Sequence, residues 1–262
     1  MRAKAMDDWT YEPAPDLEQT VAERMRAFPR QPDMAVYALR GVFQTSLRAI
    51  LRAYNGFDVR GAENLPMDES FVMVSNHSSH LDAICLLASL PLSRMHAAFP
   101  AAAADYFFAG FPRTMFSAIA INGLPFDRTK GSGSLEICRE LLAKPGRILI
   151  LFPEGTRTLS GTPGRFRLGI ARLVAGTKTP VVPCYLSGAY EAWPKGAFLP
   201  RPRPLRLHIG QPRRFADVTP GDRDAAVSIC TQLRNDVLAL SPERAHAYRL
   251  SFPVQAPIEF HR

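Results

Sequence analysis

One short segment joins a histidine to an aspartate at a spacing that suits acid–base chemistry. It reads Ser75-Asn76-His77-Ser78-Ser79-His80-Leu81-Asp82 and lies between a predicted strand and a predicted helix. Residues five apart on a continuous helix point ~140° away from each other. The two side chains can therefore meet only if His77 stays in the loop and Asp82 enters the first helical turn. Asp82 would then accept a hydrogen bond from one ring nitrogen and leave the other nitrogen as a base.

The same residues permit two other interpretations. Ser79 and Asp82 have the S-x-x-D spacing of a capping box, in which Asp82 would only stabilise the start of the helix. His77, His80 and Asp82 could also bind a metal ion, but the sequence has neither the H-E-x-x-H pattern nor a further cluster of ligands. These residues alone do not decide between catalysis and capping.

Further segments carry arginines that could bind an anion. Pro125-Phe126-Asp127-Arg128 and Phe152-Pro153-Glu154-Gly155-Thr156-Arg157 each end in arginine, and Phe166-Arg167-Leu168-Gly169 could present another cation. Gly155 permits a sharp turn or a close approach to a ligand, and arginine suits bidentate contact with phosphate. Glu154 could hold an arginine or a substrate hydroxyl. The alternative for each arginine is a surface ion pair.

Short strands alternate with helices around these segments, and these elements must position them. This alternation predicts an α/β fold with a mostly parallel mixed sheet flanked by helices, in which sites lie at the carboxyl ends of strands. The segment Gly131-Ser132-Gly133-Ser134 is predicted to be a short flexible loop. The predicted strands are 71–74, 121–126, 147–152, 181–186 and 205–209, and the predicted helices are 81–90, 135–143, 168–175 and one through Ala226, Ile229, Leu233, Val237 and Leu240.

Residues 1–56 are predicted to form a polar segment and amphipathic helices, which precede a core at 57–215 and a C-terminal helix and tail at 216–262. One short helix is expected from Asp16 to about Phe28, and a longer one after Pro32-Asp33 to about Tyr54. The longer helix either docks on the core or rests on a membrane, and both hold if its apolar stripe faces each way. That stripe comprises Val36, Leu39, Phe43, Leu47, Ile50, Leu51 and Tyr54, with Arg40, Arg48 and Arg52 among them.

The composition narrows the class of protein. The 262 residues are 47% hydrophobic, enough for one large domain with a substantial core. A net charge of +8 favours anionic partners without choosing among them. The basic run 201–206 could favour nucleic acid, but no nucleic-acid motif accompanies it, and an anionic membrane surface explains the same residues.

Neither cysteine spacing nor hydropathy indicates secretion or a membrane span. No pair of the four cysteines forms a CxxC motif, so we expect buried free thiols in a reducing compartment. The N-terminus has no apolar segment like that of a signal peptide. No uncharged apolar run reaches the roughly 18–20 residues of a spanning helix, so the chain is expected to be soluble or to lie on a membrane.

Together these segments resemble the glycerolipid acyltransferase family typified by the 1-acylglycerol-3-phosphate acyltransferases. The family has four ordered blocks: N-H-x-S-x-x-D, G-x-x-F-x-x-R, F-P-E-G-T-R-S and a V-P-hydrophobic-P block. Here residues 76–82 match the first completely, and 152–158 match the third with Thr158 in place of serine. Residues 122–128 form the second, with Asn122 and Pro125 replacing Gly and Phe, and 179–183 form the fourth. Order and spacing agree across about residues 60–215.

The resemblance implies a function and a role for each residue. His77 would be the general base and Asp82 its orienting partner, and the acceptor would be bound by Asn76, Ser79, Arg128, Glu154, Gly155, Thr156, Arg157 and Arg167. The reaction would move a fatty-acyl group from acyl-CoA or acyl-carrier protein to the free hydroxyl of 1-acylglycerol-3-phosphate, giving phosphatidic acid in phospholipid biosynthesis. The family uses neither a metal nor a covalent acyl-enzyme. A base of pKa near ~6.5 and a thiol leaving group of pKa near ~8.5 suit this reaction at neutral pH.

Several expectations accompany this function. We expect a peripheral protein at the cytoplasmic side of a membrane, with a lysophospholipid, an acyl thioester and an anionic membrane surface as partners and no nucleic acid. The apolar stretch 96–120 is a candidate for part of the acyl channel, although core packing explains it as well. The alternatives are the same chemistry on glycerol-3-phosphate, another lysophospholipid or an amino-acid lipid, and a lipid-binding protein without activity.

Overall fold

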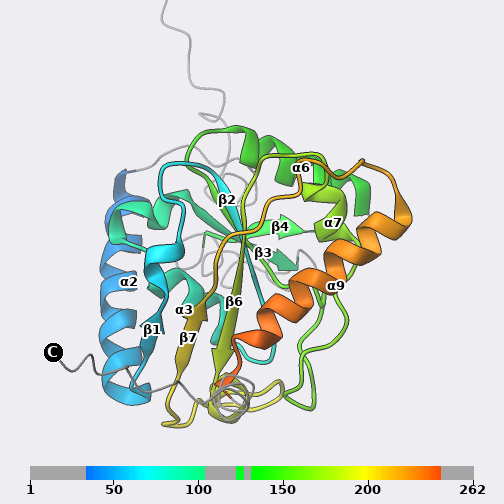
Figure 1. Ribbon diagram of the computed structural model, residues 1–262. Coiled ribbons are helices and arrows are strands. Elements are labelled where there is room, and N and C mark those ends of the chain that lie inside the picture. The colour runs from blue at the N-terminus through cyan, green and yellow to red at the C-terminus, as the bar shows by residue number, and fades with distance from the viewer. Residues whose placement is uncertain (1–33, 104–121, 127–130, 243–262) are drawn as a thin grey trace, which may run out of the picture.

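A seven-stranded sheet forms the centre of the computed structural model, which describes residues 34–103, 122–126 and 131–242 (Figure 1). The strand order is β1-β7-β6-β2-β5-β3-β4. Among these strands only β6 and β7 pair antiparallel, so the predicted mostly parallel mixed sheet is confirmed. The strands are β1 (Asp58–Arg60), β2 (Phe71–Ser75), β3 (Ala98–Ala103), β4 (Leu124–Phe126), β5 (Ile148–Leu151), β6 (Val181–Ser187) and β7 (Arg206–Ile209).

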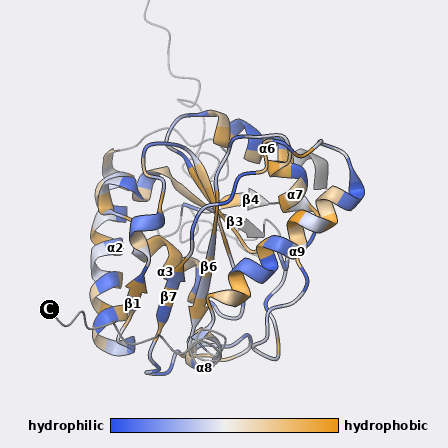
Figure 2. Cartoon of the chain, in the orientation of Figure 1, coloured by the Kyte–Doolittle hydropathy of each residue, from blue (hydrophilic) through white to orange (hydrophobic). Residues whose placement is uncertain are grey.

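Helices cover both faces of the sheet (Figures 1 and 2). The α-helices are α2 (Met34–Asn55), α3 (Asp82–Ser89), α6 (Gly131–Ala143), α7 (Gly169–Val174), α8 (Ala189–Ala192) and α9 (Arg223–Ala239), and the 3₁₀ helices are η1 (Ala62–Asn64) and η2 (Leu92–Ala97).

The central strand β2 is buried along its whole length because its two faces pack in two different hydrophobic cores. Phe71 and Met73 belong to the core that includes residues of α2 and α3. Val72 and Val74 belong to the core that includes residues of α6, α7 and α9. Side chains alternate between the faces of a strand, so a continuous apolar run is the expected pattern for a strand covered on both sides.

Helices α2 and α9, from the two outer segments, pack on this domain. Leu51 of α2 lies in the first core, and Leu233 of α9 lies in the second. Both helices therefore pack on the same sheet as the predicted core at 57–215. The expected helix from Asp16 to Phe28 lies outside the described residues.

Helix α2 divides its apolar stripe between two environments. Leu51 is buried and Phe43 and Leu47 are partly buried against the core, whereas Leu39 and Ile50 are more than half exposed. Part of the apolar stripe of α2 therefore faces the core, and another part faces the exterior of the protein. In the described ranges, no helix has both the length and the apolar character that crossing a bilayer requires.

Several predictions of local structure were wrong. Gly131–Ser134, predicted as a flexible loop, forms the first turn of α6. The burial of Cys138 and Leu141 farther along the same helix offsets the weak helix propensity of glycine. The strands β1 and β3 were not predicted. β3 consists of alanines around Phe99 and Pro100, so propensity does not favour a strand there, and pairing with β4 and β5 creates one.

Candidate active site

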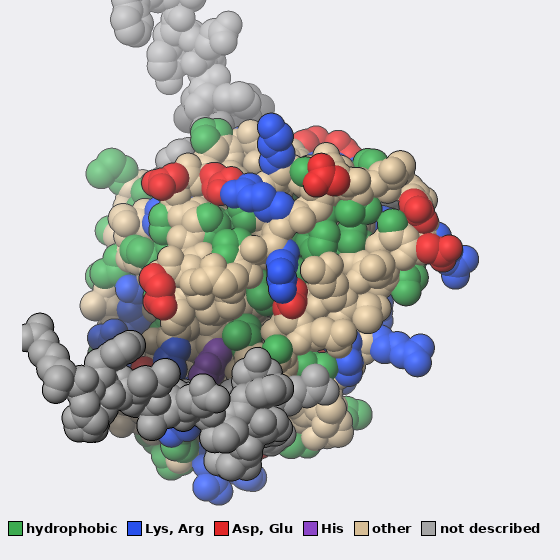
Figure 3. Space-filling view, viewed as in Figure 1, with side chains coloured by type: hydrophobic (Ala, Val, Ile, Leu, Met, Phe, Trp, Pro, Cys, Tyr) green, Lys and Arg blue, Asp and Glu red, His purple; other side chains and the backbone are tan. Residues whose placement is uncertain are grey.

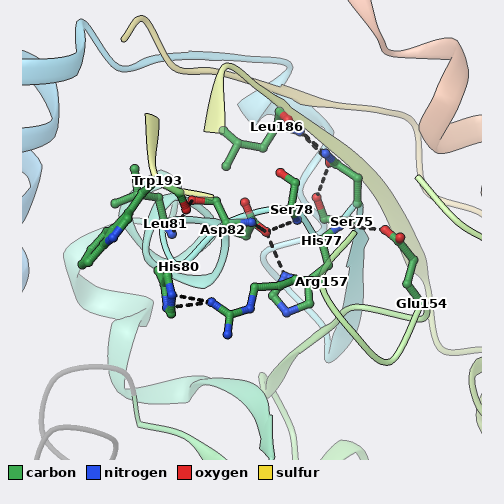
Figure 4. Close-up of polar contacts among 12 residues, drawn as sticks. Ser75, His77, Ser78, His80, Leu81, Asp82, Glu154, Arg157, Leu186 and Trp193 are labelled. Carbon is green, nitrogen blue, oxygen red and sulfur yellow. Dashed lines mark hydrogen bonds and ion pairs between the residues drawn. The ribbon is translucent and has the colours of Figure 1, made fainter. Parts of the chain in front are cut away.

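The predicted histidine and arginine segments meet at one edge of the sheet. β2 and β5 are parallel neighbours, with Val74 opposite Leu151. Their carboxyl ends therefore lie side by side, and the loop 76–81 after β2 meets the loop 152–157 after β5. A backbone hydrogen bond of 2.9 Å from Thr158 N–H to the His77 carbonyl joins the two loops. Figure 4 shows the side chains that gather here.

His77 and Asp82 form the predicted dyad. The His77 Nδ1 atom lies 2.8 Å from Asp82 Oδ2. Asp82 opens α3, whereas His77 precedes the helix, which confirms the arrangement that the spacing required. The Asp82 side chain is fully buried and the His77 side chain is 20% exposed. The carboxylate is thus shielded from water while the imidazole can reach a substrate.

The surroundings of Asp82 fix the tautomer of His77. Asp82 Oδ2 also accepts the backbone N–H groups of Ser78 at 2.6 Å and of Ser79 at 2.8 Å. An ionised carboxylate only accepts hydrogen bonds, so His77 Nδ1 carries a proton and Nε2 carries the lone pair. The Phe152 ring stacks on the imidazole at 4.2 Å and 18° and holds its plane. Asp82 therefore stabilises the start of the helix and orients the base at the same time, so the two interpretations of this residue are compatible.

Glu154 connects three loops from a buried position. Its Oε1 accepts the His77 N–H and its Oε2 accepts the Gly164 N–H, both at 2.8 Å. Burial raises the pKa of the Glu154 carboxyl, and the hydrogen bonds from Gly164 and His77 oppose this shift. Both oxygens are engaged by backbone, so Glu154 positions His77. The described contacts of the Glu154 carboxylate are with backbone groups, and its expected contact with the substrate stays a prediction.

Asn76 and Ser79 bind backbone groups in the structure, and their expected contact with the substrate stays a prediction. The Asn76 amide exchanges two hydrogen bonds with the backbone of Leu186, at 3.0 and 2.9 Å, and ties the end of β2 to β6. Ser79 Oγ donates to the Trp193 carbonyl at 2.8 Å and accepts the Leu81 N–H at 3.1 Å. Both side chains are buried and occupied by backbone, so they shape the loop that carries His77.

Arg157 lies against a histidine of the first motif. Its Nη1 atom is 2.8 Å from Nδ1 and 2.6 Å from Nε2 of His80. A guanidinium only donates, so His80 accepts in its neutral form. Burial and the nearby positive charge of Arg157 lower the pKa of His80, which favours that form. The Trp193 ring packs on the other side, 5.1 Å from the His80 ring.

The loop around Gly155 brings a second arginine close. Gly155 has a φ of +73°, and a Cβ atom there would lie 2.6 Å from Arg167 Nε. Thr156 is exposed. The positive φ therefore favours glycine here, and a larger residue would also require the Arg167 side chain to shift. The loop places Arg157 and Arg167 on its surface, where the sequence predicted cations.

The structure describes the second motif from Asn122 to Phe126. Asn122 occupies the position of the usual glycine and has a φ of +51°, which asparagine tolerates better than most residues. Its side-chain amide donates to the carbonyls of His96 and Ala98. Asn122 thus has a left-handed backbone conformation that glycine also adopts readily. Arg128 lies outside the described residues, as does 104–120 of the candidate acyl channel.

Sequence reasoning missed the roles of His80, Trp193 and Phe152. His80 was considered only as a metal ligand, yet its place inside the first motif was a signal. Trp193 gave no signal, because the fold alone brings it to the site. In the described ranges, no three His, Cys, Asp or Glu side chains gather to hold a metal ion.

Comparisons with known proteins show which family this chain belongs to. A family profile described as Acyltransferase matches residues 56–187, half of the chain. A 1-acyl-sn-glycerol-3-phosphate acyltransferase of Bacillus subtilis is 31% identical over 174 residues, which cover 66% of this chain and 81% of that protein. One from Limnanthes alba is 28% identical over 165 residues, 62% of this chain and 56% of its own length. The chain spans about half the length of the plant relatives it matches.

The fold is shared with a solved structure. The crystal structure of the 1-acyl-sn-glycerophosphate acyltransferase from Thermotoga maritima superposes with a TM-score of 0.60 at 22% identity, over 84% of this chain and 88% of that one. Given the match of the family profile and the identity to the Bacillus subtilis protein, this chain belongs to the acyltransferase family, and it is similar to the 1-acyl-sn-glycerol-3-phosphate acyltransferases.

Proposed function

We propose that this protein transfers a fatty-acyl group from acyl-CoA or acyl-carrier protein to the free hydroxyl of 1-acylglycerol-3-phosphate, giving phosphatidic acid. One observation carries the proposal. The His77–Asp82 dyad lies at the carboxyl ends of β2 and β5, and the loop after β5 supplies Arg157 beside it. A base next to a cation suits an acceptor that bears both a hydroxyl and a phosphate.

The proposed reaction uses His77 Nε2 as the general base. The acceptor hydroxyl oxygen attacks the thioester carbonyl carbon while Nε2 takes its proton. Buried Asp82 stabilises the imidazolium that forms. The tetrahedral intermediate then collapses, the carbon–sulfur bond breaks, and the thiolate recovers the proton from His77. The proton taken from the hydroxyl thus ends on the thiol, and these steps call for no metal or cofactor.

Arginines bind the acceptor phosphate in this proposal. Arg157 and Arg167 both lie on the surface of the loop that follows β5. Arg128, by its place in the second motif, is assigned to the same phosphate. Arginine can make two parallel hydrogen bonds to a phosphate, so the phosphate would fix the direction in which the acceptor hydroxyl points. Thr156 is exposed beside them and is assigned to the acceptor as well.

We further propose that the protein is peripheral, at the cytoplasmic side of an anionic membrane. Leu39, Val42 and Ile50 expose an apolar face of α2, and the chain carries a net charge of +8. All four cysteines are free and buried, as expected in a reducing compartment. A helix with one face on the core and another toward lipid would hold the enzyme at the surface that contains its acceptor.

Thiol release is the direct test of the reaction. The purified protein is mixed with long-chain acyl-CoA and lysophosphatidic acid, beside His77→Ala and the matched control His208→Ala on β7. We expect acceptor-dependent release by the wild type and by His208→Ala, and none by His77→Ala. A His77→Ala variant as fast as the wild type would refute the mechanism.

The same assay distinguishes the proposed function from its alternatives. Release with glycerol-3-phosphate, another lysophospholipid or an amino-acid lipid, but not with lysophosphatidic acid, would change the acceptor and keep the chemistry. A wild type that binds lipid but releases no thiol with any acceptor, from acyl-CoA or from acyl-carrier protein, would indicate a lipid-binding protein without activity.

A further inference from the structure

The loop 193–204 between α8 and β7 exposes two adjacent apolar side chains. Phe198 is 91% exposed and Leu199 is 68% exposed. Single exposed apolar residues are common on soluble proteins. An adjacent pair that includes a large aromatic ring at a loop tip is a candidate contact surface for a membrane or another molecule.

This loop is ordered by its own hydrogen bonds. The Arg201 N–H donates to the Ala192 carbonyl at 2.8 Å and closes the loop at its base. Trp193 Nε1 donates to the Ala197 carbonyl at 2.9 Å inside it. Prolines at 194, 200, 202 and 204 restrict the backbone further. The fold therefore holds Phe198 and Leu199 outward.

The loop is fastened to the C-terminal end of α2. Tyr54 Oη donates to the Pro200 carbonyl at 3.2 Å. Asn55 Nδ2 donates to the carbonyls of Arg201 and Arg203, at 3.1 and 3.0 Å. Tyr54 is itself exposed, as is Ile50 one turn earlier. The apolar tip of the loop thus continues into the exposed apolar face of α2.

Positive charges flank the apolar tip. Lys195, Arg201 and Arg203 are exposed, and no acidic residue occurs between residues 192 and 206. Figure 3 shows Lys and Arg side chains at the lower end of the molecule, where this loop lies in Figure 1. Apolar side chains that enter the acyl boundary, with cations at the level of the headgroups, suit an anionic bilayer.

The same loop leads directly to the candidate active site. The Trp193 carbonyl accepts the hydrogen bond from Ser79 Oγ at 2.8 Å, and the Trp193 ring lies 5.1 Å from the ring of His80, which contacts Arg157. Only four residues separate Trp193 from Phe198. A membrane contact at this tip would place the phosphate-binding arginine next to the lipid surface.

We propose that loop 193–204 docks on an anionic lipid bilayer by inserting Phe198 and Leu199, with Lys195, Arg201 and Arg203 on the headgroups. This contact presents the lysolipid acceptor to the active site. The inference rests on the proposed function for the identity of that acceptor, and it adds the surface through which the acceptor arrives.

Vesicle sedimentation tests the docking surface. Wild type, Phe198→Ser/Leu199→Ser and the control Val227→Ser, a half-exposed position on α9, are mixed with phosphatidylcholine vesicles with and without phosphatidylglycerol. We expect the double variant to bind the anionic vesicles about tenfold or more weakly, and the control to bind like the wild type. Arg201→Gln/Arg203→Gln should weaken binding to anionic vesicles at low salt only.

Activity gives an independent measure. The double variant should acylate vesicle-presented lysophosphatidic acid about tenfold more slowly and a short-chain, monomeric acceptor at the rate of the wild type. Wild-type vesicle binding by the double variant would overturn the inference. So would a wild-type dimer that the substitutions dissociate while vesicle binding stays unchanged. If the wild type acylates nothing but still needs Phe198 and Leu199 for vesicle binding, the docking surface stands and the proposed function fails.

Discussion

Asp82 accepts from His77 Nδ1 at 2.8 Å with the same oxygen, Oδ2, that accepts the backbone N–H groups of Ser78 and Ser79. The base and the turn that carries it therefore depend on one buried carboxylate. Any substitution at Asp82 tests the charge and the turn together, unless the shape of the side chain is kept.

The substitution Asp82→Asn keeps the shape and removes the charge. We expect kcat to fall about 100-fold or more, because a neutral amide stabilises the imidazolium less well. The fold should be retained, because the amide oxygen can still accept the Ser78 and Ser79 N–H groups. Steady-state kinetics and a thermal melt measure the two effects. Asp236→Asn, which removes the surface ion pair with Arg213, is the control and should leave kcat unchanged.

Glu154→Gln tests a positioning role from a buried site. A glutamine has one accepting oxygen, so its NH₂ group must face the N–H of either His77 or Gly164. We expect the free energy of unfolding to fall by about 1–3 kcal/mol, with a lower kcat. Urea unfolding checks the stability, beside Glu136→Gln on the exposed face of α6. Equal stability of the two variants would contradict the role given to Glu154.

Arg157→Ala should act on acceptor binding. We expect the KM for the acceptor to rise about tenfold or more, because a charge-assisted contact to phosphate is lost, while the KM for acyl-CoA stays the same. His80→Phe keeps the packing on Trp193 but removes the acceptor for Arg157, and should give a smaller change in the same direction. If Arg157→Ala leaves the acceptor KM unchanged, the phosphate site lies elsewhere.

Gly155→Ala combines backbone strain with a clash. Gly155 and Gly221 both have positive φ, but only at Gly155 would a Cβ meet a side chain, that of Arg167. We therefore expect Gly155→Ala to cost more stability than Gly221→Ala, which measures the strain of roughly 1–2 kcal/mol alone. In Gly155→Ala/Arg167→Ala the excess should disappear. If the double variant still loses more stability than Gly221→Ala, the added methyl group clashes with atoms other than those of Arg167.

Three histidines should make the protein less stable as the pH is lowered through their titration range. Burial lowers the pKa of His80, His96 and His208 in the folded protein. The unfolded chain then binds protons first, so the stability is complete above about pH 6.5 and is lost as the pH falls toward the lower folded values. Urea unfolding at about pH 7.5 and about pH 5.5 measures the slope. His80→Phe should reduce it, whereas an unchanged slope would exclude His80 as a source.

Local sequence patterns were enough to predict the fold class, most elements and the dyad. The alternation of apolar strands with helices indicated the α/β class, because helices and strands differ in the spacing at which apolar residues repeat. The five-residue spacing of His77 and Asp82 allowed a single local arrangement for a dyad, and the structure has it. Local patterns sufficed wherever both partners lie within a few residues.

Features that depend on contacts between distant segments could not be predicted in this way. Glu154, Asn76 and Ser79 were expected to bind substrate, yet their partners are backbone groups, of Leu186, Trp193 and Gly164 among others. Trp193 joined the site only because the end of β6 lies beside the end of β2. β3 is a strand because it pairs with β4 and β5. Only the folded structure shows that Leu51 of α2 is buried in the core whereas Ile50 of the same helix is exposed. In each case the deciding energy comes from packing or hydrogen bonds between segments far apart in the chain, which no local pattern records.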